Sequence, residues 1–166
     1  MKINRVFARA NHQTFKIKPI TKLLERYVKG LWIDPFAGAN SPATITNDIN
    51  PNMPTHHHLD AQDFAKLFHL DMFDGVLFDP PYSYRQITEH YKSVGIKANF
   101  KDTSYNFYRR VMKPLAKQVK KGGYAISFGW NSNGFGKVNG FEIVKILLVA
   151  HGLHHNDTIC TVEIKK

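Results

Sequence analysis

The chain has 166 residues, 43% of them hydrophobic and 22% charged, which is ordinary for one soluble globular domain. It has no apolar run of membrane-spanning length and no signal-peptide core, and its single cysteine excludes an internal disulfide, so we expect a cytoplasmic protein. The net charge of +10, from 23 Lys and Arg against 13 Asp and Glu, favours a polyanionic partner such as nucleic acid.

The first half of the chain alternates helical and strand-like segments. Residues 17–30 predict a short helix, because Pro19 suits a first turn, apolar residues recur on one face and Gly30 ends the segment. Residues 31–38 predict a buried strand that a proline and a glycine break. The β-branched segment "ATITNDINP" predicts a second strand, which ends at Asp48.

The second half of the chain becomes richer in strands. Residues 57–70 indicate a short strand or turn that leads into a brief helix, and residues 100–121 predict the longest helix. Further strands are expected at residues 76–79, 122–130, 141–150 and 158–165. The short segment between the last two suits a hairpin loop. Together these elements predict one α/β domain over residues 1–166, with a mostly parallel sheet and an antiparallel C-terminal hairpin.

Acidic residues end three of the predicted strands, at Asp34, Asp48 and Asp79, and Asp63 follows in "DAQDF". In an open α/β sheet, ligands bind outside the carboxyl ends of the strands. Carboxylates gathered there suit a ligand that carries an amine, a ribose diol and an adenine amino group. The glycine of "DPFAGAN", Gly38, would allow the backbone to approach such a ligand closely.

Two motifs, "DPFAGAN" at residues 34–40 and "DPPY" at residues 79–82, resemble motifs of S-adenosylmethionine-dependent amino-methyltransferases, which modify exocyclic amines of nucleic-acid bases. The resemblance implies a Rossmann-like methyltransferase fold, S-adenosylmethionine as cofactor, and similarity to compact members from phages and mobile elements. The cofactor-binding residues it implies are Asp34, Pro35, Phe36, Gly38, Asp48, Ile49, Asp63 and Phe64.

The DPPY motif has a chemical reading beside the resemblance. The Asp79 carboxylate and the Pro80 carbonyl can each accept one N–H from an adenine amine and favour its nucleophilic form. Pro80 and Pro81 hold the backbone in a set conformation, and Tyr82 can stack on a base that has left the duplex. This chemistry needs no metal. The contiguous histidines at residues 56–58 cannot all face one ion, and we interpret them as loop residues.

The connections between the early strands are shorter than the family requires. Asp34 and Asp48 are fourteen positions apart, and two prolines interrupt "NPNMPT" after the second strand. We therefore expect the first two crossover helices to be shortened or missing. Because a parallel sheet is normally covered on both faces, the bared face predicts a homodimer.

The spacing of the motifs leaves no room for a separate target-recognition domain. Substrate contacts are expected from residues 83–106 and from the start of the long helix, with Tyr84, Arg85 and Arg109 as candidates. The leading hypothesis is an adenine-N6 methyltransferase that acts on DNA. The alternatives are a methyltransferase for RNA bases and a non-catalytic binding protein that kept the fold.

Overall fold

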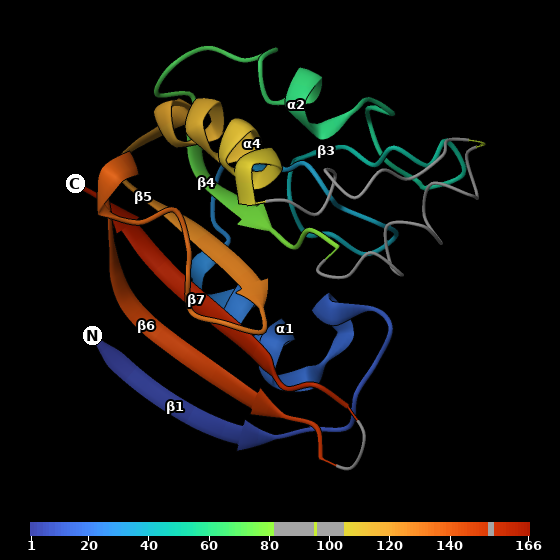
Figure 1. The fold of residues 1–166 in the computed structure, drawn as a ribbon, viewed down its shortest axis with the longest axis vertical. Helices are drawn as coiled ribbons and strands as arrows, with labels where there is room; N and C mark the ends of the chain where they lie inside the picture. Colours follow the sequence, from blue (N-terminus) through green and yellow to red (C-terminus); the bar gives the residue numbers. More distant parts are fainter. Residues whose placement is uncertain (82–94, 96–104, 153–154) are drawn as a thin grey trace.

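The structure, a computed structural model, describes residues 1–81, 95, 105–152 and 155–166 (Figure 1). Its described strands are β1 (Lys2–Phe7), β2 (Trp32–Asp34), β3 (Ile45–Thr46), β4 (Phe73–Phe78), β5 (Val119–Gly129), β6 (Phe141–Ala150) and β7 (Thr158–Lys165). Its described helices are α1 (Lys18–Tyr27), α2 (Ala61–Phe64) and α4 (Tyr105–Gln118), with 3₁₀ turns η1 (Thr14–Lys16) and η3 (Lys137–Asn139). These strands form one sheet in the order β1-β6-β7-β5-β4-β2-β3.

The sheet confirms the predicted fold class. β2 pairs in parallel with β3 and β4, and β4 pairs in parallel with β5. β7 lies between β5 and β6 and is antiparallel to both. The predicted C-terminal hairpin is therefore present, with both strands at the predicted residues.

The prediction missed β1, which forms one edge of the sheet. β1 pairs in parallel with β6, so that Lys2 lies opposite Lys145 and Val6 opposite Val149. Side chains alternate between the two sides of a strand, and Val6 packs towards the α1 side of the sheet. Ile3 and Phe7 therefore lie on the other side, where they are 63% and 74% exposed.

The early crossovers are as short as predicted. The residues between β2 and β3 form turns without a helix, and α2 between β3 and β4 has four residues. Side-chain hydrogen bonds hold these loops: the Asn47 amide donates to the carbonyl oxygens of Pro35 and Leu59 and accepts the Leu59 N–H. A buried amide thus satisfies backbone groups that a helix would have satisfied itself.

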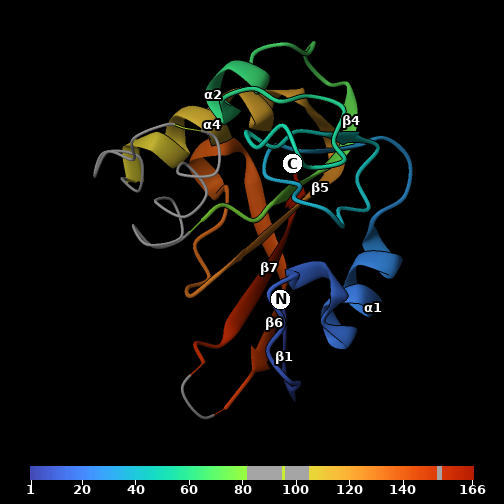
Figure 2. The same cartoon turned by 90° about the vertical axis from the view of Figure 1, so that its right-hand side faces the viewer.

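The sheet packs against helices on both sides (Figure 2). On one side, Val111 and Leu115 of α4 pack against Val76 of β4. On the other side, Ile20 and Leu24 of α1 belong to a second core with apolar residues of β4, β5, β6 and β7. The two cores together anchor the carboxyl ends of β2 and β4.

Candidate active site

A cavity of about 430 Å³ lies at the carboxyl ends of β2, β4 and β5. The segment between β1 and α1 forms one wall, and the connection from β6 to β7 forms another. Residues after β2, β3 and β4 form the remaining walls. A cavity therefore lies at the strand ends, where the sequence placed the candidate site.

Asp34 organises the turn that follows β2 and lies beneath the cavity wall. Its side chain is fully buried, and its carboxylate accepts the Phe36 N–H at 2.9 Å and the Ser41 hydroxyl at 2.6 Å. Burial raises the pKa of Asp34 to about 7, although both hydrogen bonds lower it; the nearby charges of Asp79 and Asp48 raise it further. Asp34 itself does not line the cavity, whereas Pro35 and Phe36 do.

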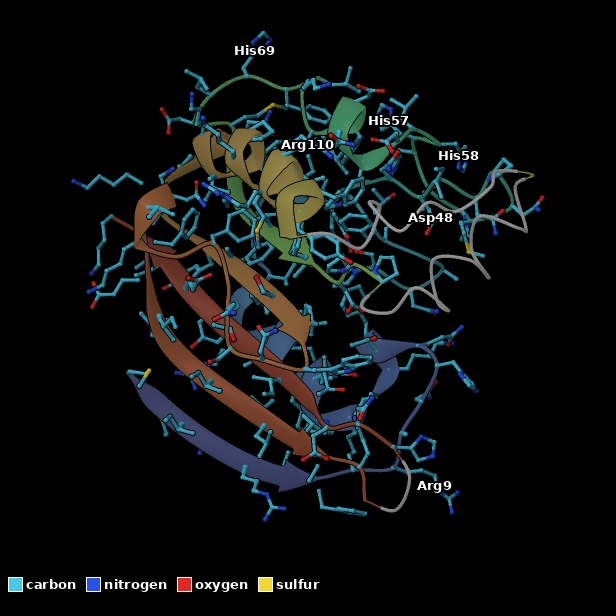
Figure 3. All side chains as sticks on the ribbon, in the orientation of Figure 1. Arg9, Asp48, His57, His58, His69 and Arg110 are labelled. Carbon is cyan, nitrogen blue, oxygen red and sulfur yellow. The ribbon has the colours of Figure 1, made fainter. Side chains whose placement is uncertain are left out.

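Asp48 follows β3, and its side chain links the loop after β2 to the loop after β3 at the cavity wall. One of its carboxylate oxygens accepts the Gly38 N–H at 3.1 Å, and the other accepts the Asn50 N–H at 2.8 Å. His58 Nδ1 lies 3.2 Å from the Asp48 carbonyl oxygen, and both residues are labelled in Figure 3. Asp48 and Ile49 line the cavity; Gly38, with a φ of 53°, instead shapes the turn behind it.

The structure places Asp63 and Phe64 outside the cavity. Asp63 is exposed on α2 and pairs with Lys66 at 2.9 Å. Phe64 is fully buried and packs its ring against His57. The cavity is lined instead by Asp60, which caps the amino end of α2 by accepting the Gln62 N–H, and by Ala61. The α2 helix turns the two predicted side chains away from the cavity.

Asp79 is the first residue after β4 and lines the cavity together with Pro80 and Pro81. Burial raises the pKa of Asp79 to about 6, and the nearby Thr14 side chain lowers it in part. The Tyr108 hydroxyl of α4 donates to the Pro81 carbonyl oxygen. The α4 helix therefore holds the backbone of the motif.

The remaining predicted substrate residues are only partly covered by the structure. Tyr82, Tyr84 and Arg85 lie outside the described residues. Arg109 is exposed on α4. The segment 83–106, expected to contact substrate, also falls almost wholly outside the described part of the chain.

Sequence reasoning missed several residues that line the cavity. Trp130 directly follows β5 and is 49% exposed. His151 is buried at the end of β6, and its two ring nitrogens lie 2.8 Å from the Ala8 carbonyl oxygen and 2.9 Å from the Thr158 hydroxyl. The only available signal was position, because Trp130 and His151 each come at the end of a predicted strand.

The described residues contain neither a metal-binding cluster nor a membrane-spanning helix. No three His, Cys, Asp or Glu side chains among them are grouped closely enough to hold a metal ion. None of the described helices combines the length and the apolar character that crossing a membrane requires.

No protein-family model and no curated protein matches the chain. Solved methyltransferase structures do share its fold. TrmN from Thermus thermophilus matches with a TM-score of 0.56 and 14% identity, over 90% of this chain and 48% of that one. This chain thus spans about half the length of TrmN.

Two N-methyltransferases match over more of their own length. The 1,6-didemethyltoxoflavin-N1-methyltransferase of Burkholderia thailandensis, with bound S-adenosylhomocysteine, has a TM-score of 0.56 and 10% identity, over 90% of this chain and 77% of that one. NodS from Bradyrhizobium japonicum WM9 has a TM-score of 0.57 and 9% identity, over 90% and 94% of the two chains. At identities this low, the structural matches show that the fold is shared and nothing more.

Proposed function

We propose that this protein is an S-adenosylmethionine-dependent methyltransferase that acts on the N6 amine of adenine in DNA. The observation that carries the proposal is the position of Asp79 and Pro80. They line a cavity at the carboxyl edge of a sheet whose fold N-methyltransferases share. The net charge of +10 supports nucleic acid as the substrate.

The walls of the cavity fit the proposed cofactor. Pro35, Phe36 and Ile49 supply apolar surface, and Asp48 and Asp60 supply carboxylates for hydroxyl or amino groups. Each oxygen of Asp48 uses one acceptor position on a backbone N–H and keeps another for a ligand. A volume of about 430 Å³ lies within the ordinary range of ligand sites. When bound, S-adenosylmethionine supplies a methyl group that a positively charged sulfur activates.

The other residues predicted to bind the cofactor take different roles in this proposal. Asp34 and Gly38 shape the turn that carries Phe36. Asp63 and Phe64 support α2, so we assign the adenine end of the cofactor to the neighbouring Asp60 and Ala61. The bound S-adenosylhomocysteine in the toxoflavin methyltransferase supports this choice of cofactor by analogy of fold.

Asp79 and Pro80 are proposed to orient the adenine amine. The ionised Asp79 carboxylate accepts one N–H, and the Pro80 carbonyl accepts the other, so that the nitrogen lone pair can face the methyl group. Within a buried site these hydrogen bonds are stronger than in water. With a pKa of about 6, Asp79 is ionised at neutral pH yet basic enough to accept the proton that the methylated amine releases.

The aromatic substrate is proposed to lie between the motif and the end of β5. Trp130 offers a half-exposed ring in the same cavity as Asp79 and suits stacking on a flat base. Tyr82 and Tyr84 are proposed as further stacking residues. Arg85 and Arg109 are proposed to contact phosphate.

The test is transfer of labelled methyl groups to unmethylated DNA, with an equal amount of RNA assayed in parallel. We expect label in DNA adenine. Label in RNA alone would mean that the substrate is RNA and would contradict the proposal for DNA. Absence of transfer to both, together with no heat of cofactor binding in calorimetry, would leave the non-catalytic alternative.

A homodimer is also part of the proposal. Ile3 and Phe7 expose apolar surface on the side of the sheet away from α1, and a second copy would cover it. Light scattering at micromolar concentration tests this, and a mass of 19.0 kDa would contradict it.

A further inference from the structure

The outer side of α1 carries a line of positive charge. The helix buries Ile20, Leu23 and Leu24 against the sheet. Its exposed cations recur every four residues, and a lysine lies just beyond each end. We call the five the basic ridge: Lys16, Lys18, Lys22, Arg26 and Lys29. Over the same stretch the chain has a single acid, Glu25.

The basic ridge begins at the rim of the candidate active site. Thr14 and Ile17, on either side of Lys16, both line the 430 Å³ cavity, which Asp79 also lines. From there α1 runs for ten residues, or about 15 Å, towards the opposite end of the sheet. A ligand extending out of the cavity along α1 would meet one cation at each turn of the helix.

The far end of the ridge opens into a second cavity of about 600 Å³. Arg26 and Lys29 line it, and so do Lys120 and Lys121 at the start of β5. One acidic residue, Asp74, also lines this cavity. One oxygen of its carboxylate pairs with Lys120 Nζ at 2.7 Å, and the other accepts the Leu31 N–H at 2.7 Å. The acid is thus engaged, and the cavity keeps a net positive charge.

Within the described part of the chain, no acidic side chain forms an ion pair with any of the five ridge cations. Positive neighbours add to this charge. The pKa of Lys145 is lowered, first by burial and then by the nearby charges of Arg26 and Lys2. Such crowding of like charges costs stability unless an anion relieves it.

We propose that the basic ridge binds the phosphate backbone of the DNA that flanks the target base, an inference that rests on the proposed function. Cations four residues apart rise about 6 Å along a helix, close to the axial distance of about 7 Å between every second phosphate of one strand. These contacts would be independent of base sequence. Arg110 of α4, labelled in Figure 3, belongs to a separate surface, because α4 lies on the other side of the sheet from α1 (Figure 2).

The test neutralises the middle of the ridge in the full-length protein. In the triple variant Lys18→Gln, Lys22→Gln and Arg26→Gln, we expect duplex DNA to bind about tenfold more weakly at low salt in fluorescence anisotropy. The slope of log affinity against log salt should fall by about 3, one for each lost phosphate contact. A matched triple, Lys66→Gln, Lys137→Gln and Lys166→Gln, removes the same charge elsewhere and should retain most of the affinity.

Two controls keep the outcome specific. Circular dichroism and cofactor calorimetry should be unchanged in both triples; if the ridge triple is misfolded, the single changes Lys22→Gln and Arg26→Gln are measured in its place. Equal weakening by both triples would mean a net-charge effect and would overturn the ridge, as would no weakening by either. Preference of the ridge for RNA over duplex DNA would overturn it as a DNA site. If the wild-type protein transfers no methyl group but its DNA binding still depends on the ridge, the result would contradict the proposed function and leave the ridge standing.

Discussion

Thr14 and Asp79 line the same cavity, and the Thr14 side chain lies close enough to the Asp79 carboxyl to lower its pKa. Thr14 belongs to the segment before α1, and Asp79 follows β4, so the cavity brings together two distant parts of the chain. A nearby hydroxyl favours the ionised form of the carboxyl group.

Replacing Thr14 by Val should therefore raise the pKa of Asp79. We expect the acid limb of the pH–rate profile to move to higher pH and the rate at neutral pH to fall severalfold, while Thr14→Ser restores both. A lower rate with an unshifted acid limb would mean that Thr14 acts only through packing.

Replacing Asp79 by Ala should remove an acceptor on which the proposed transfer depends. We expect the single-turnover rate to fall by a factor on the order of 10² to 10³, with cofactor affinity in calorimetry nearly unchanged. Asp79→Asn keeps an acceptor oxygen and should lie between Ala and wild type. A wild-type rate in Asp79→Ala would contradict the proposed chemistry.

The buried carboxyl of Asp34 should make stability depend on pH. Its pKa of about 7 in the folded state is above the usual value of about 3.9 in an unfolded chain. Between these values the folded state holds more protons, so the free energy of unfolding should fall by a few kcal/mol as pH rises from 4 to 7. Urea unfolding across this range should give a flatter curve for Asp34→Asn, and identical curves would refute the assignment.

Trp130 should report on substrate binding. The chain has two tryptophans, and the other, Trp32, is fully buried with its Nε1 donating to the Lys29 carbonyl oxygen. Stacking of a base on Trp130 should quench its fluorescence when DNA is added. Trp130→Phe should abolish the quench and keep most of the activity, whereas Trp130→Ala should lower it. A quench that persists in Trp130→Phe would place the base elsewhere.

Gly75 should tolerate no side chain. A Cβ at this position would lie 2.4 Å from the ring of Trp32, which is itself fully buried. Gly75→Ala should lower the free energy of unfolding by about 1–3 kcal/mol, measured by urea unfolding. Gly38→Ala is the matched control. At Gly38 an added Cβ meets no atom within 4 Å but the φ is +53°, so this variant measures the cost of backbone strain without crowding.

Local patterns predicted the parts of the fold that depend on local chemistry. Alternating apolar residues defined β6 and β7, and short proline-containing segments indicated the missing crossover helices. Asp48 and Asp79 reached one cavity because the carboxyl ends of parallel strands meet at one edge of a sheet. β1 was missed because its partner, β6, lies at the far end of the chain.

The residues that sequence reasoning misplaced or missed depend on tertiary packing. Asp63 stands three positions from Asp60, and the turn of α2 decides which of the two faces the cavity. Thr14 and Trp130 line the same cavity as Asp79 only because separate elements converge on one edge of the sheet. No local pattern carries that information.

The ring of His151 joins the segment after β1 to the first residue of β7, and β1 itself pairs residue 2 with residue 145. The segment that carries Thr14 therefore has its anchor near the end of the chain. Closing so long a loop is slow, because its entropy is lost before the contacts form. A chain still emerging from the ribosome, with β6 and β7 not yet made, has no completed cavity, so any ligand that this cavity binds must wait until β7 has been synthesised.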